Sequence, residues 1–478
     1  MAFTGQSFVA LLPELISTGF LILVLMAGVF SESNAGVAAG LAALGTLAVF
    51  GSAAVLLATG FSGSYFGGGF VVDGFALYFK LIVAGSAFFA VLAAARWSGQ
   101  TGDAPEYLTL ILSVVLGSTL LVSMRDLFGI FLAIELATIP SYAMVAFDRS
   151  RRESAEGGMK YLITGVIASS VLLYGIVLIY GVSGSAMLQD VADTFSGTLT
   201  PVALLGLVLM ISGFAFKLSA APFHFWTPDA YQGAPTSAAA FLSVGPKAAT
   251  FAVLLRILLE GMPNAAPTWT AVMAILAIIT MFVGNLFALR QRNVRRMLAY
   301  SSVAHSGYIL AAFAAMQGGG VAFAVQAVLI YTAAYAVMNM GAFLVIDLVG
   351  EETKSYNGLV RTNPGVAASM ALFMAALVGI PPLSGFFGKL WIIIAGAQSG
   401  SVLVYIVVGV LVVNTVLSVP YYFGIIRNMI FEEPTTDTAR TKGSGAVRFC
   451  VYVLALLTTL FGLLIIPLSA LVGASGLA

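Results

Sequence analysis

Charged residues and metal-binding residues are scarce in this sequence. Only 9% of its 478 residues are charged, against about 25% in typical soluble domains. The net charge of +1 offers no basic surface to a nucleic acid. The chain has one cysteine, Cys450, and two histidines, His224 and His305. Since an iron–sulfur cluster or a structural zinc site generally needs several Cys or His ligands, we expect no metal, no bound cofactor and no internal disulfide.

Apolar residues, in contrast, make up 60% of the chain, and the mean hydropathy is +1.03. Such a chain has too few polar residues to form a surface that faces water, so we expect lipid to surround it. Because a run of about 20 apolar residues crosses a bilayer, we predict an all-α, multi-pass membrane protein of about fourteen transmembrane helices. The predicted helices lie near residues 9–30, 35–59, 71–95, 106–124, 126–147, 157–181, 200–221, 235–260, 268–288, 297–316, 320–349, 366–396, 401–428 and 447–472.

Lysine and arginine are distributed unevenly among the predicted loops. Loops after odd-numbered helices hold fifteen of them, whereas the other side holds only Arg125 and Arg256. Because basic loops remain cytoplasmic, we predict cytoplasmic odd-numbered loops and two termini on the non-cytoplasmic side. The N-terminal apolar run lacks the features of a signal peptide and is interpreted as the first spanning helix. The expected location is a bacterial inner membrane or an equivalent energy-coupling membrane.

Five ionisable residues inside the predicted helices are candidates for function. Insertion of a charge at the centre of a spanning helix costs about 2.5–3.5 kcal/mol even on the scale of membrane-insertion energies that gives low values. Such a charge is therefore expected to face the protein interior. Several of these charges lie beside prolines, which free backbone carbonyl groups that only protein or water can satisfy in a membrane. The candidates with such a neighbour are Glu135 (near Pro140), Lys217 (near Pro222), Lys247 (after Pro246) and Lys389.

Lys389 lies near the end of the segment GIPPLSGFFGKLW, whose prolines and glycines predict an unwound stretch in the middle of the membrane. Lys80, the fifth residue, has no proline neighbour and lies two helical turns from Asp73, on the same face. We interpret Lys80 as a structural or snorkelling charge. His305 titrates near neutral pH and is a candidate proton relay, with a hydrogen-bonded core histidine as the alternative. His224 is a candidate relay or only a cap of a broken helix.

The chemistry that these residues support is proton transfer. Burial among apolar side chains disfavours a charged lysine, and a nearby glutamate restores the charge by Coulomb attraction. Movement of Glu135 relative to Lys217 would therefore switch the lysine between holding and releasing a proton.

Two segments with broken helices, KLSAAPFHFW and PPLSGFFGKLW, lie five predicted helices apart. Because five is odd, two five-helix units would enter the membrane in opposite orientations, as in inverted-repeat transporters. We predict repeats at 106–260 and 261–428, after three N-terminal helices at 1–105 and before a loop and final helix at 429–478.

Residues 217–257, KLSAAPFHFWTPDAYQGAPTSAAAFLSVGPKAATFAVLLRI, resemble the antiporter-like, proton-translocating membrane subunits of respiratory complex I. The segments FLSVGPKA, AYSSVAHSGY and GIPPLSGFFGKLW are similar to the subunit N variants of the pattern, and the similarity covers most of the chain. The resemblance implies that Glu135 and Lys217 are a switching pair and Lys247 the central proton carrier. It likewise implies that His305 is the connecting relay and Lys389 the terminal carrier.

The resemblance also implies what lies elsewhere. As a subunit of a proton-translocating NADH-quinone oxidoreductase, the chain would carry out no redox chemistry itself. NADH, flavin, iron–sulfur clusters and most of the quinone site would belong to partner subunits, and other antiporter-like membrane subunits would be its neighbours. Two alternatives stay open: a subunit of a multisubunit Na⁺/H⁺ antiporter, and a purely structural membrane scaffold with inert charges.

Overall fold

Apolar runs of this sequence form helices because a chain surrounded by lipid can satisfy its backbone N–H and C=O groups only within each spanning segment. The computed structural model describes residues 5–30, 35–101, 103–194, 196, 199–434 and 445–464. Eleven helices within these ranges are long and apolar enough to cross a membrane. The prediction of a helical, multi-pass membrane protein is therefore confirmed. Arg440, Lys442 and the predicted end of the last helix at 465–472 lie outside the described residues.

The N-terminal part combines long helices with a short β-hairpin that the all-α prediction missed. Its strands pair antiparallel, with Gly63 opposite Val72, and Gly67 and Gly68 adopt positive φ angles of 72° and 93° that permit the tight turn between them. The elements are α1 (Gly5–Ala10), α2 (Leu12–Phe30), α3 (Ala35–Ala58), β1 (Gly63–Tyr65), β2 (Phe70–Val72) and α4 (Gly74–Thr101).

The predicted first repeat contains eight helices, several of them short. They are α5 (Ala104–Ser123), α6 (Leu127–Val145), α7 (Arg152–Ser183), α8 (Leu188–Thr194), α9 (Pro201–Lys217), α10 (Trp226–Gly233), α11 (Thr236–Leu242) and α12 (Gly245–Arg256). The remainder of the chain contains α13 (Ala266–Ala288), α14 (Val294–Ala314), α15 (Val321–Val349), α16 (Leu359–Thr362), α17 (Pro364–Val378), α18 (Ser384–Gln398), α19 (Val402–Phe431) and α20 (Gly445–Leu463).

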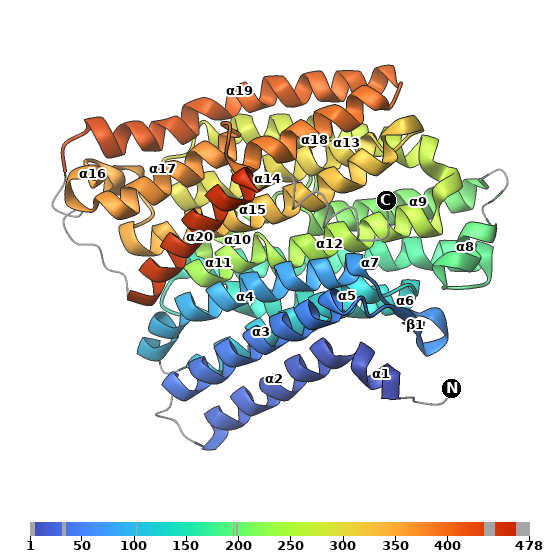
Figure 1. Ribbon diagram of the computed structural model, residues 1–478, viewed down its shortest axis with the longest axis horizontal. Helices are drawn as coiled ribbons and strands as arrows, with labels where there is room; N and C mark the ends of the chain where they lie inside the picture. The colour runs from blue at the N-terminus through green and yellow to red at the C-terminus, as the bar shows by residue number, and fades with distance from the viewer. Residues whose placement is uncertain are drawn as a thin grey trace.

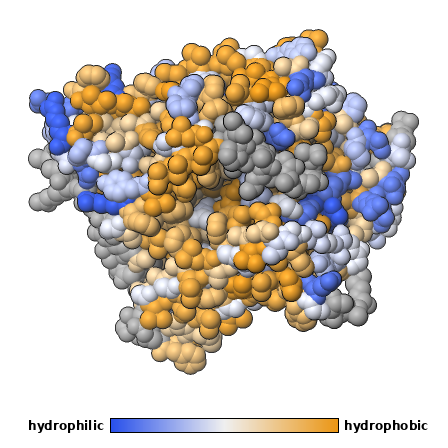
Figure 2. Space-filling model, in the orientation of Figure 1, coloured by the Kyte–Doolittle hydropathy of each residue, from blue (hydrophilic) through white to orange (hydrophobic). Residues whose placement is uncertain are grey.

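The long helices lie side by side along the horizontal axis of Figure 1, with β1 and α8 at one end of the bundle and α16 at the other. Figure 2 shows a broad apolar surface between hydrophilic residues at the two ends of this axis. Many large apolar side chains are exposed in the structure, and Leu132 and Val416, for example, expose 67% and 65% of their area. An apolar belt between two polar ends is the surface that a bilayer requires.

Three of the predicted spanning segments are interrupted. The segment at 200–221 ends as a helix at Lys217, and the segment at 235–260 is divided into α11 and α12 around Ser243 and Val244. The segment at 366–396 is divided into α17 and α18, where Gly379 adopts a left-handed φ of 92°. Each interruption lies within a few residues of a lysine, so the breaks position the candidate site.

Candidate functional site

Lys217 and Glu135 meet between α9 and α6. The ammonium nitrogen of Lys217 lies 3.5 Å from Oε1 of Glu135 and donates hydrogen bonds to Oγ1 of Thr138 at 3.1 Å and Oγ of Ser169 at 3.2 Å. Ser169 in turn donates to Oε1 of Glu135 at 2.6 Å. The structure therefore brings the predicted pair together and adds two hydroxyl groups. Thr138 was detectable from sequence, because residues three apart on a helix share a face, whereas Ser169 on α7 was not.

The break after Lys217 is stabilised by side chains from its surroundings. The indole nitrogen of Trp226 donates to the carbonyl oxygen of Phe216 at 3.2 Å, and the amide of Ala221 donates to Oγ1 of Thr280 at 3.0 Å. Lys217 itself occupies the last turn of α9, where the partial negative charge of the helix C-terminus favours a cation. Helix α9 thus ends at Lys217, and these hydrogen bonds hold the backbone around the break in place.

Lys247 lies in the first turn of α12 and donates to Oγ of Ser302 on α14 at 2.7 Å. The ring of Tyr231 is 5.7 Å from its ammonium nitrogen. A cavity of about 30 Å³ is lined by both Lys217 and Lys247. Because one water molecule needs roughly 10–15 Å³ of such volume, the cavity has room for water between the two lysines. Its polar lining also includes Ser118, Thr138, Ser141 and Thr250.

His305 lies at the centre of α14 and is held by two tyrosines. Its Nδ1 is 2.8 Å from the hydroxyl of Tyr331, and its Nε2 is 3.1 Å from the hydroxyl of Tyr422. Tyr422 also hydrogen-bonds to Ser301, the residue next to the partner of Lys247. A neutral imidazole offers one donor and one acceptor, and each hydroxyl can serve as either. The hydroxyl groups of Tyr331, Tyr422 and Ser301 therefore form a polar cluster around His305. Ser302, which binds Lys247, is the next residue of α14 after Ser301.

Lys389 binds the end of the helix that precedes it. Its ammonium nitrogen donates to the carbonyl oxygens of Val378 at 2.8 Å and Leu377 at 3.4 Å, and it lies 4.5 Å from the ring centre of Tyr308. The last carbonyl groups of a helix lack partners within the helix and carry partial negative charge. The predicted unwound stretch occurs at 379–383. Lys389 itself lies within α18 and reaches back across the break.

The predicted partner of Lys80 is wrong. Lys80 forms an ion pair of 2.7 Å with Glu14 on α2, and both side chains are buried. Asp73 lies just before α4 begins, so its side chain caps that helix by accepting from the amide of Ala76 at 2.7 Å. Asp73 also accepts from Arg256 at 3.0 and 3.1 Å. Of the two interpretations, a structural or a snorkelling charge, the buried pair with Glu14 supports the structural one.

His224 is a predicted site residue that does not contact the other site residues within the described part of the chain. It lies in the loop between α9 and α10, and its ring packs against Phe225 with 4.6 Å between ring centres. Its described contacts do not join it to Lys217 or Lys247. Within the described ranges, no group of three or more His, Cys, Asp and Glu residues could hold a metal ion.

Comparisons with known proteins find similar sequences and similar folds. The family described as "NADH:quinone oxidoreductase/Mrp antiporter, TM" matches residues 124–418. The NADH-quinone oxidoreductase subunit N of Rubrobacter xylanophilus is 73% identical over 480 residues, which cover 100% of both chains. A chain in the respiratory complex I of Thermus thermophilus has a TM-score of 0.83 at 29% identity, with 97% of this chain and 100% of that chain covered. A chain in the Mrp complex of Dietzia sp. shares the fold, with a TM-score of 0.86 at 21% identity and coverage of 99% and 97%.

Proposed function

The chain belongs to the NADH:quinone oxidoreductase/Mrp antiporter membrane family, and we propose that its buried charges form a route for protons from the Glu135–Lys217 pair to Lys389. It is an antiporter-like, proton-translocating membrane subunit of NADH-quinone oxidoreductase, of the subunit N type, and its partners are other membrane subunits of that complex. The chain itself has no redox role. In our proposal, NADH, flavin and the iron–sulfur clusters are bound by partner subunits.

The first step of the proposed route joins Lys217 to Lys247. The observation that carries the proposal is the small cavity lined by both lysines, since water within it would relay a proton that the two side chains cannot exchange directly. Glu135 controls this step through its charge. When the carboxylate is close, it holds the proton on Lys217, and when the carboxylate moves away, desolvation drives the proton toward Lys247.

The second step crosses from Lys247 to His305. Ser302 accepts a hydrogen bond from Lys247, and the neighbouring Ser301 is bound to Tyr422, which contacts Nε2 of His305. Hydroxyl groups can donate and accept in turn. Because successive residues of a helix do not face each other, we propose that water joins Ser302 to the Ser301–Tyr422 pair.

The third step leads from His305 to Lys389 past Tyr308. The ring of Tyr308 lies 5.4 Å from the imidazole ring and 4.5 Å from the Lys389 ammonium. Within the part of the chain that the structure describes, no hydrogen bond joins His305 to Lys389, so we propose that water completes this step. Lys389 would then release its proton only when the carbonyl groups of α17 are rehydrated or otherwise satisfied.

A direct test is to reconstitute the whole complex in liposomes and to measure protons pumped per electron. Lys217→Ala should abolish the contribution of this subunit to pumping without preventing membrane insertion, because alanine is better tolerated than lysine within a membrane. Wild-type pumping by the assembled Lys217→Ala complex would refute the role of this lysine.

We also propose fourteen spanning segments arranged as two inverted five-helix repeats. Eleven helices meet the length and apolarity requirements, and α9, α14 and the α17–α18 pair would supply the other three. These three segments carry Lys217, His305 and Lys389, respectively. α9 is short because it ends at Lys217, the α17–α18 pair is broken before Lys389, and α14 contains the polar His305. The breaks at Lys217 and Lys389 support corresponding positions in the two repeats.

The proposed orientation places the basic loops in the cytoplasm and α8 outside. It can be tested by single cysteines, because the natural Cys450 is buried. An impermeant maleimide added outside intact cells should label Gln189→Cys on α8 and should spare Lys354→Cys in a basic loop. The reverse pattern would overturn the orientation. The alternative of a Na⁺/H⁺ antiporter subunit has less support, because the 21% identity to the Mrp chain shows only a common fold.

A further inference from the structure

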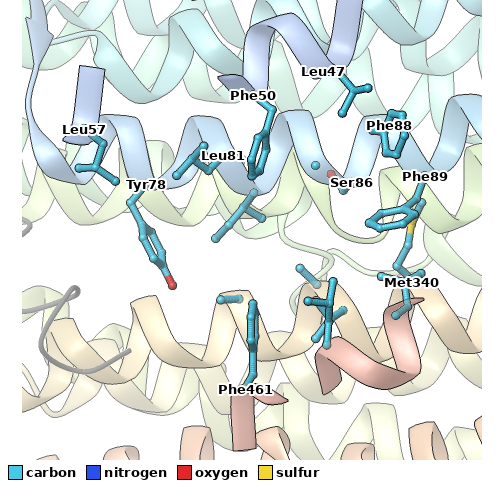
Figure 3. A pocket seen from close by; sticks show the side chains of 17 residues that line it. Leu47, Phe50, Leu57, Tyr78, Leu81, Ser86, Phe88, Phe89, Met340 and Phe461 are labelled. Atoms are coloured by element: carbon cyan, nitrogen blue, oxygen red, sulfur yellow. The ribbon is translucent and has the colours of Figure 1, made fainter. Parts of the chain in front are cut away.

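A large cavity lies apart from the proposed proton route, between α3 and α4 on one side and α15 and α20 on the other. Its volume is about 490 Å³, which is within the roughly 300–1,000 Å³ range of small-molecule sites. Figure 3 shows Phe50 and Tyr78 projecting into this space from one side and Phe461 from the other. The cavity reaches the outer surface at α3, where Leu47 and Phe50 line it and expose 46% and 40% of their area.

Among the residues that the structure describes, the lining offers no free polar group to an occupant. The described lining residues include no charged residue, and their only side-chain oxygens belong to Tyr78 and Ser86. The hydroxyl of Tyr78 donates to the carbonyl oxygen of Leu329 at 3.0 Å, and that of Ser86 donates to the carbonyl oxygen of Val83 at 2.9 Å. Both hydroxyl groups are thus already bound to the backbone. A purely apolar cavity does not retain water, which needs two to four polar partners.

We propose that this cavity binds one hydrocarbon chain of a phospholipid from the surrounding bilayer. The cavity opens among helices that are long and apolar enough to span a membrane, so lipid is the occupant that we expect at its mouth. An empty space of this size would leave its lining without dispersion contacts, and an acyl chain restores them without needing a hydrogen bond. A quinone head group or a lipid head group would find no donor within the cavity, so such groups remain outside it.

The bound chain would pack against α15, the helix whose Tyr331 contacts the relay residue His305. In α15, the cavity residues Ala333, Ala336, Val337 and Met340 recur at helical spacing and form one face. At 100° per residue, Tyr331 lies on the opposite face, where its hydroxyl contacts His305. Tyr78, in the cavity wall, binds the backbone of α15 at Leu329. An acyl chain in this cavity would therefore pack against the face of α15 that is opposite Tyr331.

The test uses the intact complex in vesicles with a phosphatidylethanolamine that carries a photoreactive diazirine in the middle of one acyl chain. After illumination, we expect mass spectrometry to find labelled peptides containing Ile82–Phe89 of α4 and Ala333–Met340 of α15. The same lipid with the diazirine in its head group should not label them. Labelling by the head-group probe at the same residues would overturn the proposal.

Two variants fill the cavity from opposite walls. Val337→Phe does so from α15. Gly85→Leu does so from α4, where an added Cβ would first meet the ring of Phe50 at an ordinary 3.6 Å. Each variant should reduce acyl labelling several-fold. Val413→Phe is the matched control, because Val413 exposes 51% of its area on α19 and does not line the cavity. Undiminished labelling in both filling variants, or labelling displaced by an isoprenoid quinone but not by phospholipid, would refute an acyl-chain site.

Discussion

Lys80 of α4 and Glu14 of α2 form an ion pair of 2.7 Å in which the side chains are 0% and 5% exposed. The aromatic ring of Phe70 lies 5.2 Å from the same ammonium group. Unlike Lys217, Lys247 and Lys389, this lysine adjoins no break in its helix. A buried lysine alone therefore does not identify a proton carrier in this protein. The partner of the lysine and the backbone around it distinguish a structural lysine from a candidate carrier.

Lys80→Met should destabilise the N-terminal helices and leave pumping per electron nearly normal in complexes that assemble. Removing one partner of a buried ion pair costs about 3–5 kcal/mol, because the other charge stays buried and unpaired. The double variant Lys80→Met/Glu14→Gln should recover most of this loss. Thermal unfolding of the purified complex and the proton-to-electron ratio measure the two effects. A double variant no more stable than the single variant would exclude the pair as the cause.

Replacement of Glu135 should impair pumping according to charge and not to size. Glu135→Gln preserves volume but removes the counter-charge of Lys217, and hydrogen bonds to charged groups contribute about 1.5–3 kcal/mol, equivalent to roughly ten-fold or more in an equilibrium. Glu135→Asp keeps the charge and should retain more activity. The initial rate of proton uptake by vesicles, normalised to NADH oxidation, compares them. Equal rates for Gln and Asp would mean that charge is not what this position supplies.

Substitutions of Lys389 can separate a carrier from a helix cap. Lys389→Met removes both the proton and the hydrogen bonds to Val378 and Leu377, so it should impair pumping severely. Lys389→Arg keeps a cation beside those carbonyl groups, but arginine stays protonated at physiological pH. We therefore expect Lys389→Arg to assemble as stably as the wild type and to pump as poorly as Lys389→Met. An active Lys389→Arg complex would assign a purely structural role to this lysine.

Tyr422→Phe should reduce pumping because it removes the hydroxyl that joins Ser301 to His305. Tyr356→Phe is a control, since the hydroxyl of that buried tyrosine donates to the carbonyl oxygen of Gly350 at 3.2 Å and lies outside the proposed route. Each change deletes one oxygen from a buried ring, so the packing loss is similar. Proton-to-electron ratios at equal NADH oxidation rates should fall for Tyr422→Phe only. A similar fall in both variants would point to packing and not to proton transfer.

Interactions that act within one segment were readable from the sequence. Apolar runs predicted spanning helices because lipid leaves the backbone no other partner. The prolines and glycines near Lys217 and Lys389 predicted interruptions, because they remove donors or allow unusual backbone angles locally. The motif at residues 217–257 was also sufficient to identify the family, since it is a continuous stretch of sequence.

Only the tertiary structure decided which side chains meet. Lys247 and Ser302 are 55 positions apart, and His305 and Tyr422 are 117 apart, so neither contact has a sequence spacing that predicts it. Lys80 meets Glu14 and not Asp73, although helical periodicity favoured Asp73. A periodic pattern states which residues share a face of one helix. It does not state which helix that face will contact. This depends on how the helices are rotated and shifted relative to one another when they pack.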